Sequence, residues 1–126
     1  MQAEQWAHGS EIADLIEAGL VSDPGTARGR LLRAAAHLFS SRGFERTTVR
    51  DLAAEVGIQS GSIFHHFRSK DDILRAVMEE TIHYNLAQMR AALTGLSDPR
   101  QRLRALIRCE LQAINGESGE AMSVLV

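Results

Sequence analysis

Hydrophobic residues recur at helical spacing along most of this chain. The first regular pattern follows a turn cluster at residues 22–25 and predicts a helix from about Thr26 to Arg42. Its apolar positions, at i, i+1, i+4, i+7 and i+8, are Leu31, Leu32, Ala35, Leu38 and Phe39. Gly43 comes directly after the last turn, where a left-handed glycine commonly ends a helix, so we expect Phe44 to fold back onto it.

Two short helices are predicted next. Either Thr47 or Thr48 can cap the first one, and Thr48 and Asp51 have the spacing of a capping box, although Asp reaches back less well than Glu. This helix ends at Gly57, and its inner face is formed by Leu52, Ala53 and Val56. A second helix over residues 60–67 follows after a very short turn, and such a pair forms a helix-turn-helix. Gln59 precedes the second helix, where its long side chain is expected to cap poorly, at a cost of about 1 kcal/mol.

A long helix is predicted from about Lys70 to Thr94. Ser69 can cap it, and two aspartates in its first turn favour the positive end of the helix dipole. At a rise of about 1.5 Å per residue it would be roughly 38 Å long, which exceeds one small core. Pro99 then begins an amphipathic helix that ends near Asn115. Its apolar positions are Leu103, Leu106, Ile107, Leu111 and Ile114.

The two ends of the chain have less regular patterns. Residues 4–20 carry an imperfect apolar stripe, and residues 121–126 are predicted to begin another apolar helix that the chain does not complete. Together the patterns predict an all-α protein in three parts. These are an acidic arm over residues 1–25, a helix-turn-helix domain over residues 26–69 and a partial helical domain over residues 70–126.

The formal net charge of −2 conceals an uneven distribution of charge. Residues 1–25 hold five acidic residues and no lysine or arginine, whereas residues 26–75 hold nine basic and five acidic residues. Residues 76–126 hold five basic and six acidic residues. The middle of the chain is therefore a basic block, which suits a polyanionic partner such as nucleic acid. Within it, Arg28 and Arg30 could touch a minor groove or a phosphate, and a solvated surface is the slightly favoured expectation.

The composition excludes several classes of protein. A length of 126 residues with 44% hydrophobic residues suits one globular domain. Cys109 is the only cysteine and matches no zinc-ligand spacing, so we expect no disulfide, no metal and no cofactor. No apolar run is long enough for a membrane span and the N-terminus lacks a basic start, so we expect a cytoplasmic protein without membrane contact. No nucleophile–base set or carboxylate pair can be assembled, which speaks against an enzyme.

The second helix of the helix-turn-helix has residues that suit the major groove of DNA. Ser60, Gly61 and Ser62 are small enough for close approach and supply two hydroxyl groups for base edges or phosphates. Ile63 and Phe67 lie four residues apart and are expected to pack inward. Further groups that could reach a phosphate are Thr47, Thr48, His65, His66 and Lys70. Taken singly, the serines and threonines are equally well explained as ordinary helix caps.

A close resemblance to the DNA-binding domain of TetR-family transcriptional regulators covers residues 47–74, TTVRDLAAEVGIQSGSIFHHFRSKDDIL, and extends over about residues 28–75. It implies a three-helix DNA-binding head, followed by a long connecting helix and part of an α-helical ligand-binding domain. In this family the matching positions form the usual DNA-contact set, here Ser60, Gly61, Ser62, Phe64, His65, His66 and Lys70. Phe64 stands where the family usually has Tyr, so a phenol bond to phosphate is lost, and Gln59 replaces a customary Ser or Thr.

The resemblance implies a sequence-specific transcriptional regulator, in the first place a ligand-released repressor that binds a pseudo-palindromic operator in double-stranded DNA as a homodimer. Residues 57–67, GIQSGSIFHHF, are similar to members that regulate fatty-acid or steroid catabolism, which favours an acyl or steroid-derived inducer. Because family members are longer, a second hypothesis is a shortened regulator that acts as a protein-interaction or heterodimerising module without an inducer response of its own. A third hypothesis, a small α-helical enzyme, has little support in the motifs.

Overall fold

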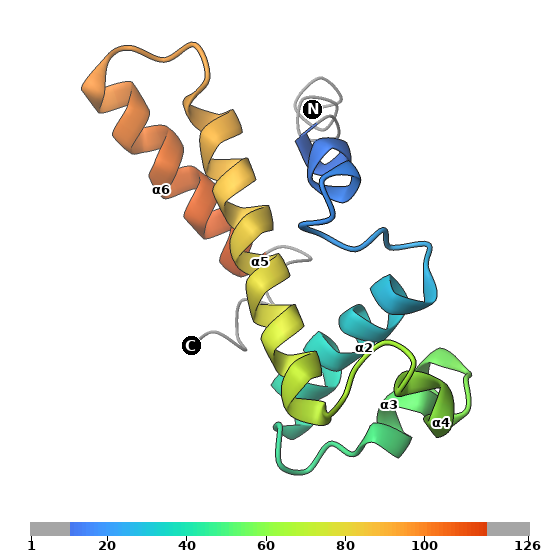
Figure 1. Cartoon of the computed structure of the whole chain (residues 1–126). Helices are drawn as coiled ribbons and strands as arrows, with labels where there is room; N and C mark the ends of the chain where they lie inside the picture. Colours follow the sequence, from blue (N-terminus) through green and yellow to red (C-terminus); the bar gives the residue numbers. More distant parts are fainter. Residues whose placement is uncertain (1–10, 116–126) are drawn as a thin grey trace.

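The computed structural model describes residues 11–115, and in this part of the chain every regular element is a helix (Figure 1). The labelled helices are α2 (Ala27–Arg42), α3 (Val49–Val56), α4 (Ser60–Ile63), α5 (Lys70–Leu93) and α6 (Pro99–Asn115). A short helical segment, residues 11–17, precedes them. The predicted all-α fold with a helix-turn-helix is confirmed. The helix predicted to begin in residues 121–126 lies outside the described residues.

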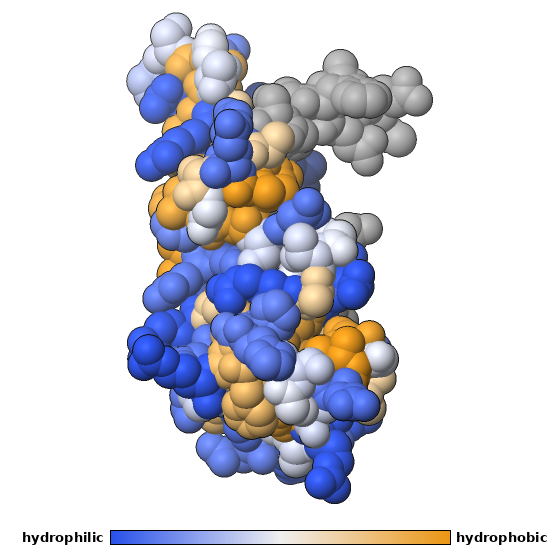
Figure 2. All heavy atoms as spheres, turned by 45° about the vertical axis from the view of Figure 1, so that its right-hand side comes forward, coloured by the Kyte–Doolittle hydropathy of each residue, from blue (hydrophilic) through white to orange (hydrophobic). Residues whose placement is uncertain are grey.

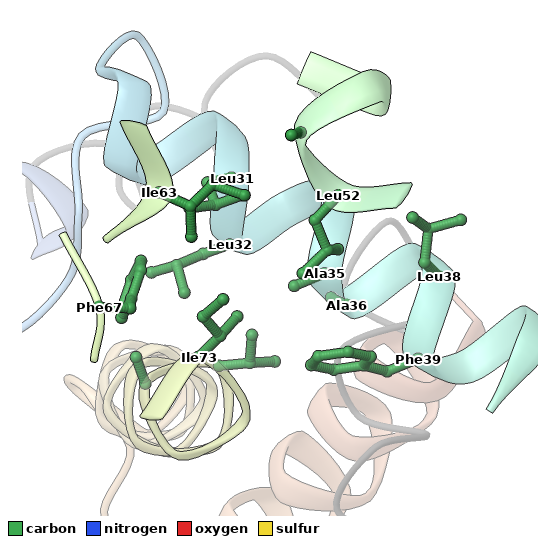
Figure 3. Close-up of a cluster of buried hydrophobic side chains, with 13 residues drawn as sticks. Leu31, Leu32, Ala35, Ala36, Leu38, Phe39, Leu52, Ile63, Phe67 and Ile73 are labelled. Carbon is green, nitrogen blue, oxygen red and sulfur yellow. The ribbon is translucent and has the colours of Figure 1, made fainter. Parts of the chain in front are cut away.

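One hydrophobic core is shared by α2, α3, α4 and the first turns of α5 (Figure 3). Its innermost side chains, one from each of these helices, are Leu31, Leu52, Ile63 and Ile73, each at most 1% exposed. Burial of one such side chain contributes about 1.5–3 kcal/mol, so the loss of any of them would loosen all four helices. We call residues 27–77, which contain this core, the head.

The helix starts follow the predicted caps. The Thr26 hydroxyl accepts a hydrogen bond from a first-turn N–H of α2 at 3.0 Å. At α3 the capping box is complete, because the Asp51 N–H donates to Thr48 Oγ1 at 3.0 Å and the Thr48 N–H donates to Asp51 Oδ2 at 2.9 Å. The Ser69 hydroxyl accepts from the Asp72 N–H at 3.2 Å and so caps α5. These bonds satisfy N–H groups that have no partner inside their own helix.

Two glycines end helices of the head. Gly43 follows α2 with φ of 91°, and the Phe44 ring then lies edge-on against the Phe39 ring, with centroids 5.2 Å apart. The expected return of Phe44 onto this helix is confirmed. Gly57 ends α3 in the left-handed region, with φ 73° and ψ 32°, which costs glycine little and other residues more.

The helix α4 is shorter than the helix predicted over residues 60–67. Its α-helical part ends at Ile63, and residues 64–66 form a turn. The N–H groups of His65 and His66 donate to carbonyl groups three residues earlier, at 3.2 and 2.9 Å, instead of four residues earlier. Such tighter bonds are common where a helix ends. They let the chain turn so that Phe67, only 6% exposed, returns to the core.

The helix α5 leaves the head and forms an antiparallel pair with α6 (Figure 1). No residue of α6 is buried, and four of its apolar side chains are more than half exposed: Leu103 60%, Ile107 53%, Leu111 55% and Ile114 59%. Figure 2 shows hydrophobic side chains gathered in the upper part of the molecule, where these two helices run, and further hydrophobic patches among the hydrophilic residues of the head. Among residues 11–115, no helix combines the length and apolar character needed to cross a membrane.

Candidate nucleic-acid interface

The first turn of α4 presents small polar residues to solvent. Ser60 and Gly61 are exposed, and Ser62 is half-buried. A Cβ atom placed on Gly61 would meet no other atom within 4 Å, so the space above this residue is open. The two serine hydroxyls can each donate and accept hydrogen bonds. The turn therefore offers an approachable backbone together with groups that can bind base edges or phosphates.

Two apolar side chains anchor α4 to the other helices of the head (Figure 3). Ile63 is 1% exposed and Phe67 is 6% exposed, and both belong to the core that includes Leu52. Val56 is partly buried and packs against the same cluster. The predicted inward packing of Ile63 and Phe67 is confirmed. Because this packing occupies one side of α4, the small residues of its first turn are left on the opposite, free side.

Three larger side chains at and after the end of α4 are also exposed. Phe64 is 57% exposed, and His65 and His66 are exposed as well. An exposed phenylalanine ring can contact a sugar or the methyl group of thymine, but it cannot donate a hydrogen bond to phosphate. A neutral imidazole carries one N–H donor, and a protonated imidazole carries two. Each residue predicted on α4 and its following turn therefore has at least part of its surface open to solvent.

The two threonines before α3 have different surroundings, and the expectation for Thr47 is corrected. The Thr47 side chain is 0% exposed, and its hydroxyl lies near two carbonyl oxygens, those of Leu38 at 3.2 Å and Gly43 at 2.9 Å. It ties the loop to α2 and is not presented to a phosphate. Thr48 is exposed, and its hydroxyl accepts the Asp51 N–H, while a hydrogen bond from the same side chain to the Asp51 carboxyl group helps to lower the pKa of that group.

Lys70 is half-buried and already has a partner inside the head. Its Nζ donates to the Phe44 carbonyl at 2.7 Å and lies 4.1 Å from the centroid of the Phe44 ring. This contact fastens the start of α5 to the loop between α2 and α3. An ammonium group has three donors, so the remaining ones can still reach a phosphate. Lys70 thus has a structural role that the sequence pattern did not indicate.

Three arginines around Thr48 were not among the predicted site residues. Arg42, Arg46 and Arg50 are all exposed and lie in the last turn of α2, in the loop and in the first turn of α3. The hydrogen bonds from Thr48, backbone first and side chain second, hold the pKa of Asp51 below its ordinary value, and the charge of Arg42 lowers it further. The signal that could have found these arginines is their membership of the basic block within a few residues of Thr48.

A second surface lies outside the head, along α6. An open groove of about 480 Å³ is lined by Leu103, Ile107 and Leu111, with Arg100, Arg104 and Arg108 beside them. It falls in the part of the chain where the ligand-binding domain was predicted. Among residues 11–115, the His, Cys, Asp and Glu side chains form no group of three that could hold a metal ion.

Comparison with known proteins identifies relatives of the head. The family model described as bacterial regulatory proteins, tetR family, matches residues 31–77. The transcriptional repressor KstR2 of Mycolicibacterium smegmatis is 36% identical over 93 residues, which cover 74% of this chain and 45% of that protein. KstR2 of Mycobacterium tuberculosis is 38% identical over 87 residues, covering 69% of this chain and 44% of the relative. The chain thus spans slightly less than half the length of these curated relatives.

Solved structures extend the similarity to the helices beyond the head. The structure of the ketosteroid transcriptional regulator KstR2 of Mycobacterium tuberculosis has a TM-score of 0.73 and 31% identity, and the match covers 83% of this chain and 53% of that one. A structure described as superantigen pfit has a TM-score of 0.82 and 65% identity, covering 90% of this chain and 57% of that one. The similarity to these structures therefore includes α5 and α6 as well as the helix-turn-helix.

Proposed function

We infer that this chain, which belongs to the TetR family of bacterial regulatory proteins, binds double-stranded DNA through the exposed first turn of α4. The observation that carries this proposal is the open surface over Ser60, Gly61 and Ser62, held outward by the buried Ile63 and Phe67. A short helix fixed in this way can enter the major groove with its N-terminal end toward the bases.

The contacts divide by chemistry. Ser60, Ser62 and His65 are suited to base edges, and Phe64 to a thymine methyl group or a sugar. Thr48, His66, Lys70 and the three exposed arginines around Thr48 are suited to phosphates, which position a protein on DNA without reading its sequence. The predicted DNA-contact set is therefore kept with Thr47 removed, because its hydroxyl is buried.

As a regulator, the chain is proposed to be a ligand-released repressor that binds a pseudo-palindromic operator as a homodimer. The two KstR2 relatives compared above are named as repressors, and the solved structure of one is described as a ketosteroid transcriptional regulator, which supports an acyl or steroid-derived inducer for this chain. Two recognition helices must reach major grooves roughly 34 Å apart, so a ligand that moves α5 would change their spacing and weaken binding.

A shortened regulator that works as an interaction module is the alternative. The exposed apolar face of α6 favours it, because four side chains that suit a helix interface are more than half exposed in the described part of the chain. Sedimentation at micromolar concentration separates the two readings. A stable homodimer supports the first reading, and a monomer that pairs with a longer relative supports the alternative.

The description of one solved neighbour as a superantigen is not carried over to this chain. That structure shares the fold and is 65% identical, and the residues described above are suited to DNA. The DNA-binding experiment described next also tests this preference for a regulator. If the head does not bind DNA, the main reason for proposing a regulator is lost.

Binding of labelled DNA tests the proposal. Fragments from the region beside the gene for this chain are compared with a scrambled fragment by fluorescence anisotropy at moderate salt. We expect preference for one fragment, an affinity that falls steeply with salt, and an altered base preference for Ser62→Ala. Ser40→Ala, an exposed serine on α2 outside the proposed site, serves as the matched control and is expected to bind as the parent does. Equal binding to all fragments would overturn the proposal.

A further inference from the structure

Ser22, Arg28 and Glu80 form a hydrogen-bonded cluster between segments far apart in the sequence. The Ser22 N–H donates to Glu80 Oε2 at 3.0 Å, and the Ser22 hydroxyl donates to Glu80 Oε1 at 2.6 Å. Arg28 Nε donates to the same hydroxyl at 3.0 Å, and Arg28 Nη2 lies 3.8 Å from Glu80 Oε1. Both oxygens of the carboxylate are therefore held. We call these three residues the joint.

The joint brings together three parts of the fold. Ser22 lies in the turn that follows the helical segment 11–17, Arg28 lies in the first turn of α2, and Glu80 lies in the third turn of α5. Arg28 keeps 40% of its side chain exposed, as expected for a partly solvated residue, but its guanidinium group is also engaged in the joint. The Arg28 side chain, which belongs to the head, thus contacts both the segment before the head and the long helix α5.

The turn before α2 is fixed by further contacts. The Thr26 hydroxyl donates to the Asp23 carbonyl at 2.7 Å, and the Gly25 N–H donates to the Asp23 carboxylate at 2.8 Å. A Cβ atom on Gly29 would collide with the Asp23 carbonyl, so the turn packs directly on the backbone of α2. Ser22 is consequently presented to Glu80 from a rigid base.

Arg28 also contacts Phe67, which follows the turn at the end of α4. Its guanidinium carbon lies 4.5 Å from the centroid of the Phe67 ring, a cation–π distance. The Phe67 N–H donates to the Ile63 carbonyl at 3.0 Å, so the ring is attached to the end of α4. The joint therefore connects the third turn of α5 to the element that carries the proposed DNA-binding residues.

Glu80 lies at a position on α5 from which a small change in its contacts would move the far end of the helix. The contribution of α5 to the core of the head ends at Val77, whereas the helix continues to Leu93, about 24 Å further at 1.5 Å per residue. Glu80 lies beyond the last core residue and so extends the contact with the head by another turn. A tilt of about 10° at the base would displace the far end by roughly 4 Å, given that length.

We propose that Ser22, Arg28 and Glu80 are positioning residues that fix the direction of α5 relative to the head. In the regulator proposed above, on which this consequence rests, the joint sets the spacing of two recognition helices without touching DNA. A ligand or partner that moves α5 would have to break or bend these bonds.

Distance measurement by pulsed electron paramagnetic resonance tests the joint without DNA. Nitroxide labels are attached to Arg33→Cys on α2 and Arg90→Cys on α5, both exposed positions, in a Cys109→Ser background. We expect one narrow distance distribution for this parent and a distribution at least twice as wide, or shifted, for Glu80→Ala. Glu79→Ala is the matched control, because Glu79 is exposed on the same helix and has no bond in the described residues. Equal distributions for the two variants would overturn the proposal.

Ser22→Ala keeps the test decisive if Glu80→Ala fails to fold. It removes one hydroxyl, leaves the pair of Arg28 and Glu80 in place, and is expected to widen the distribution less than Glu80→Ala. Helix content and melting temperature, measured by circular dichroism, show whether each variant is folded. A folded Ser22→Ala protein with the same distance distribution as the parent would contradict the proposed role of the joint.

DNA binding provides the second measurement. We expect Glu80→Ala to bind a single half-site within twofold of the parent, and to discriminate less between operators whose half-site spacing differs by one base pair. If the parent binds no DNA, the proposed function fails while the distance measurement still decides the joint. If both proteins discriminate spacing equally, the joint does not set the spacing of the recognition helices.

Discussion

A methyl group added at Gly61 would project into open space, so this position can separate stability from DNA binding. We expect Gly61→Ala to leave the unfolding free energy unchanged or to raise it by up to about 1 kcal/mol, because alanine favours helix. The same methyl group would stand between α4 and the base edges. Loss of one base contact, about 1–3 kcal/mol, lowers affinity at least about fivefold. Urea denaturation and fluorescence anisotropy measure the two effects.

Gly57→Ala is the contrasting control for that experiment. Gly57 has φ of 73°, so alanine is strained there and should destabilise the head by about 1 kcal/mol or more. A Gly61→Ala protein that binds the operator as tightly as the parent would show that DNA does not approach the backbone of α4.

The carboxyl group of Asp51 reports on the capping box of α3. Hydrogen bonds from Thr48 hold its pKa below the ordinary value of 3.8 in the folded protein. Because the folded pKa is the lower one, the stabilisation is complete above pH 3.8 and is lost as the pH falls through the folded pKa. Thr48→Val removes the side-chain bond and should raise the pKa of Asp51 toward 3.8 in an NMR titration. Thr26→Val, which removes the cap of a different helix, should leave it unchanged.

At the scale of the elements, the helices with strong local signals were predicted closely. The bounds of α2, α3, α5 and α6 lie within about two residues of the predicted ones, because each has a cap or a proline that acts within a few residues of its start. α4 was predicted too long. Gln59 at its start makes no side-chain hydrogen bond, and its end follows the need to bury Phe67.

Gln59→Ser should strengthen α4. Gln59 has the extended backbone of an N-cap residue, with φ −74° and ψ 143°, but no capping bond. A serine there can accept from a first-turn N–H, and we expect the unfolding free energy to rise by about 1 kcal/mol in urea denaturation. Gln112→Ser on the exposed side of α6 is the control, and should change stability by no more than about 0.5 kcal/mol. An equal response at both positions would show that α4 is not limited by its cap.

At the scale of the whole molecule, the exposed face of α6 contributes little to the stability of the chain. Leu103 is 60% exposed and Ile107 is 53% exposed, so replacing both with Gln should change the unfolding free energy by less than about 1 kcal/mol. The same change should reduce binding of a hydrophobic fluorescent dye and lower light scattering, because it removes exposed apolar surface.

Leu31→Gln is the control in which a fully buried side chain is replaced. This side chain is 0% exposed, and its replacement should destabilise the head by about 3 kcal/mol or more. If the double variant on α6 destabilised the protein as strongly, the apolar face would be covered in solution by another surface.

The candidate site was predicted in part, and the difference between Thr47 and Thr48 shows why the prediction was incomplete. Ser60, Gly61 and Ser62 were placed correctly on the surface because their neighbours Ile63 and Phe67 define an inward side by spacing alone. Thr47 and Thr48 cannot be told apart by residue type. Only the packed loop shows that one hydroxyl points to the carbonyl groups of α2 while the other stays in solvent.

The sequence was enough to predict most helix bounds, their caps, the basic block and the small residues that begin α4, because all of these depend on neighbours within about four residues. The partner of Lys70 and the joint of Ser22, Arg28 and Glu80 became visible only in the packed fold. Those contacts join groups 26 and 58 residues apart, and their geometry depends on how the helices pack. A side chain's type limits what it can bind, whereas the fold decides what lies within its reach.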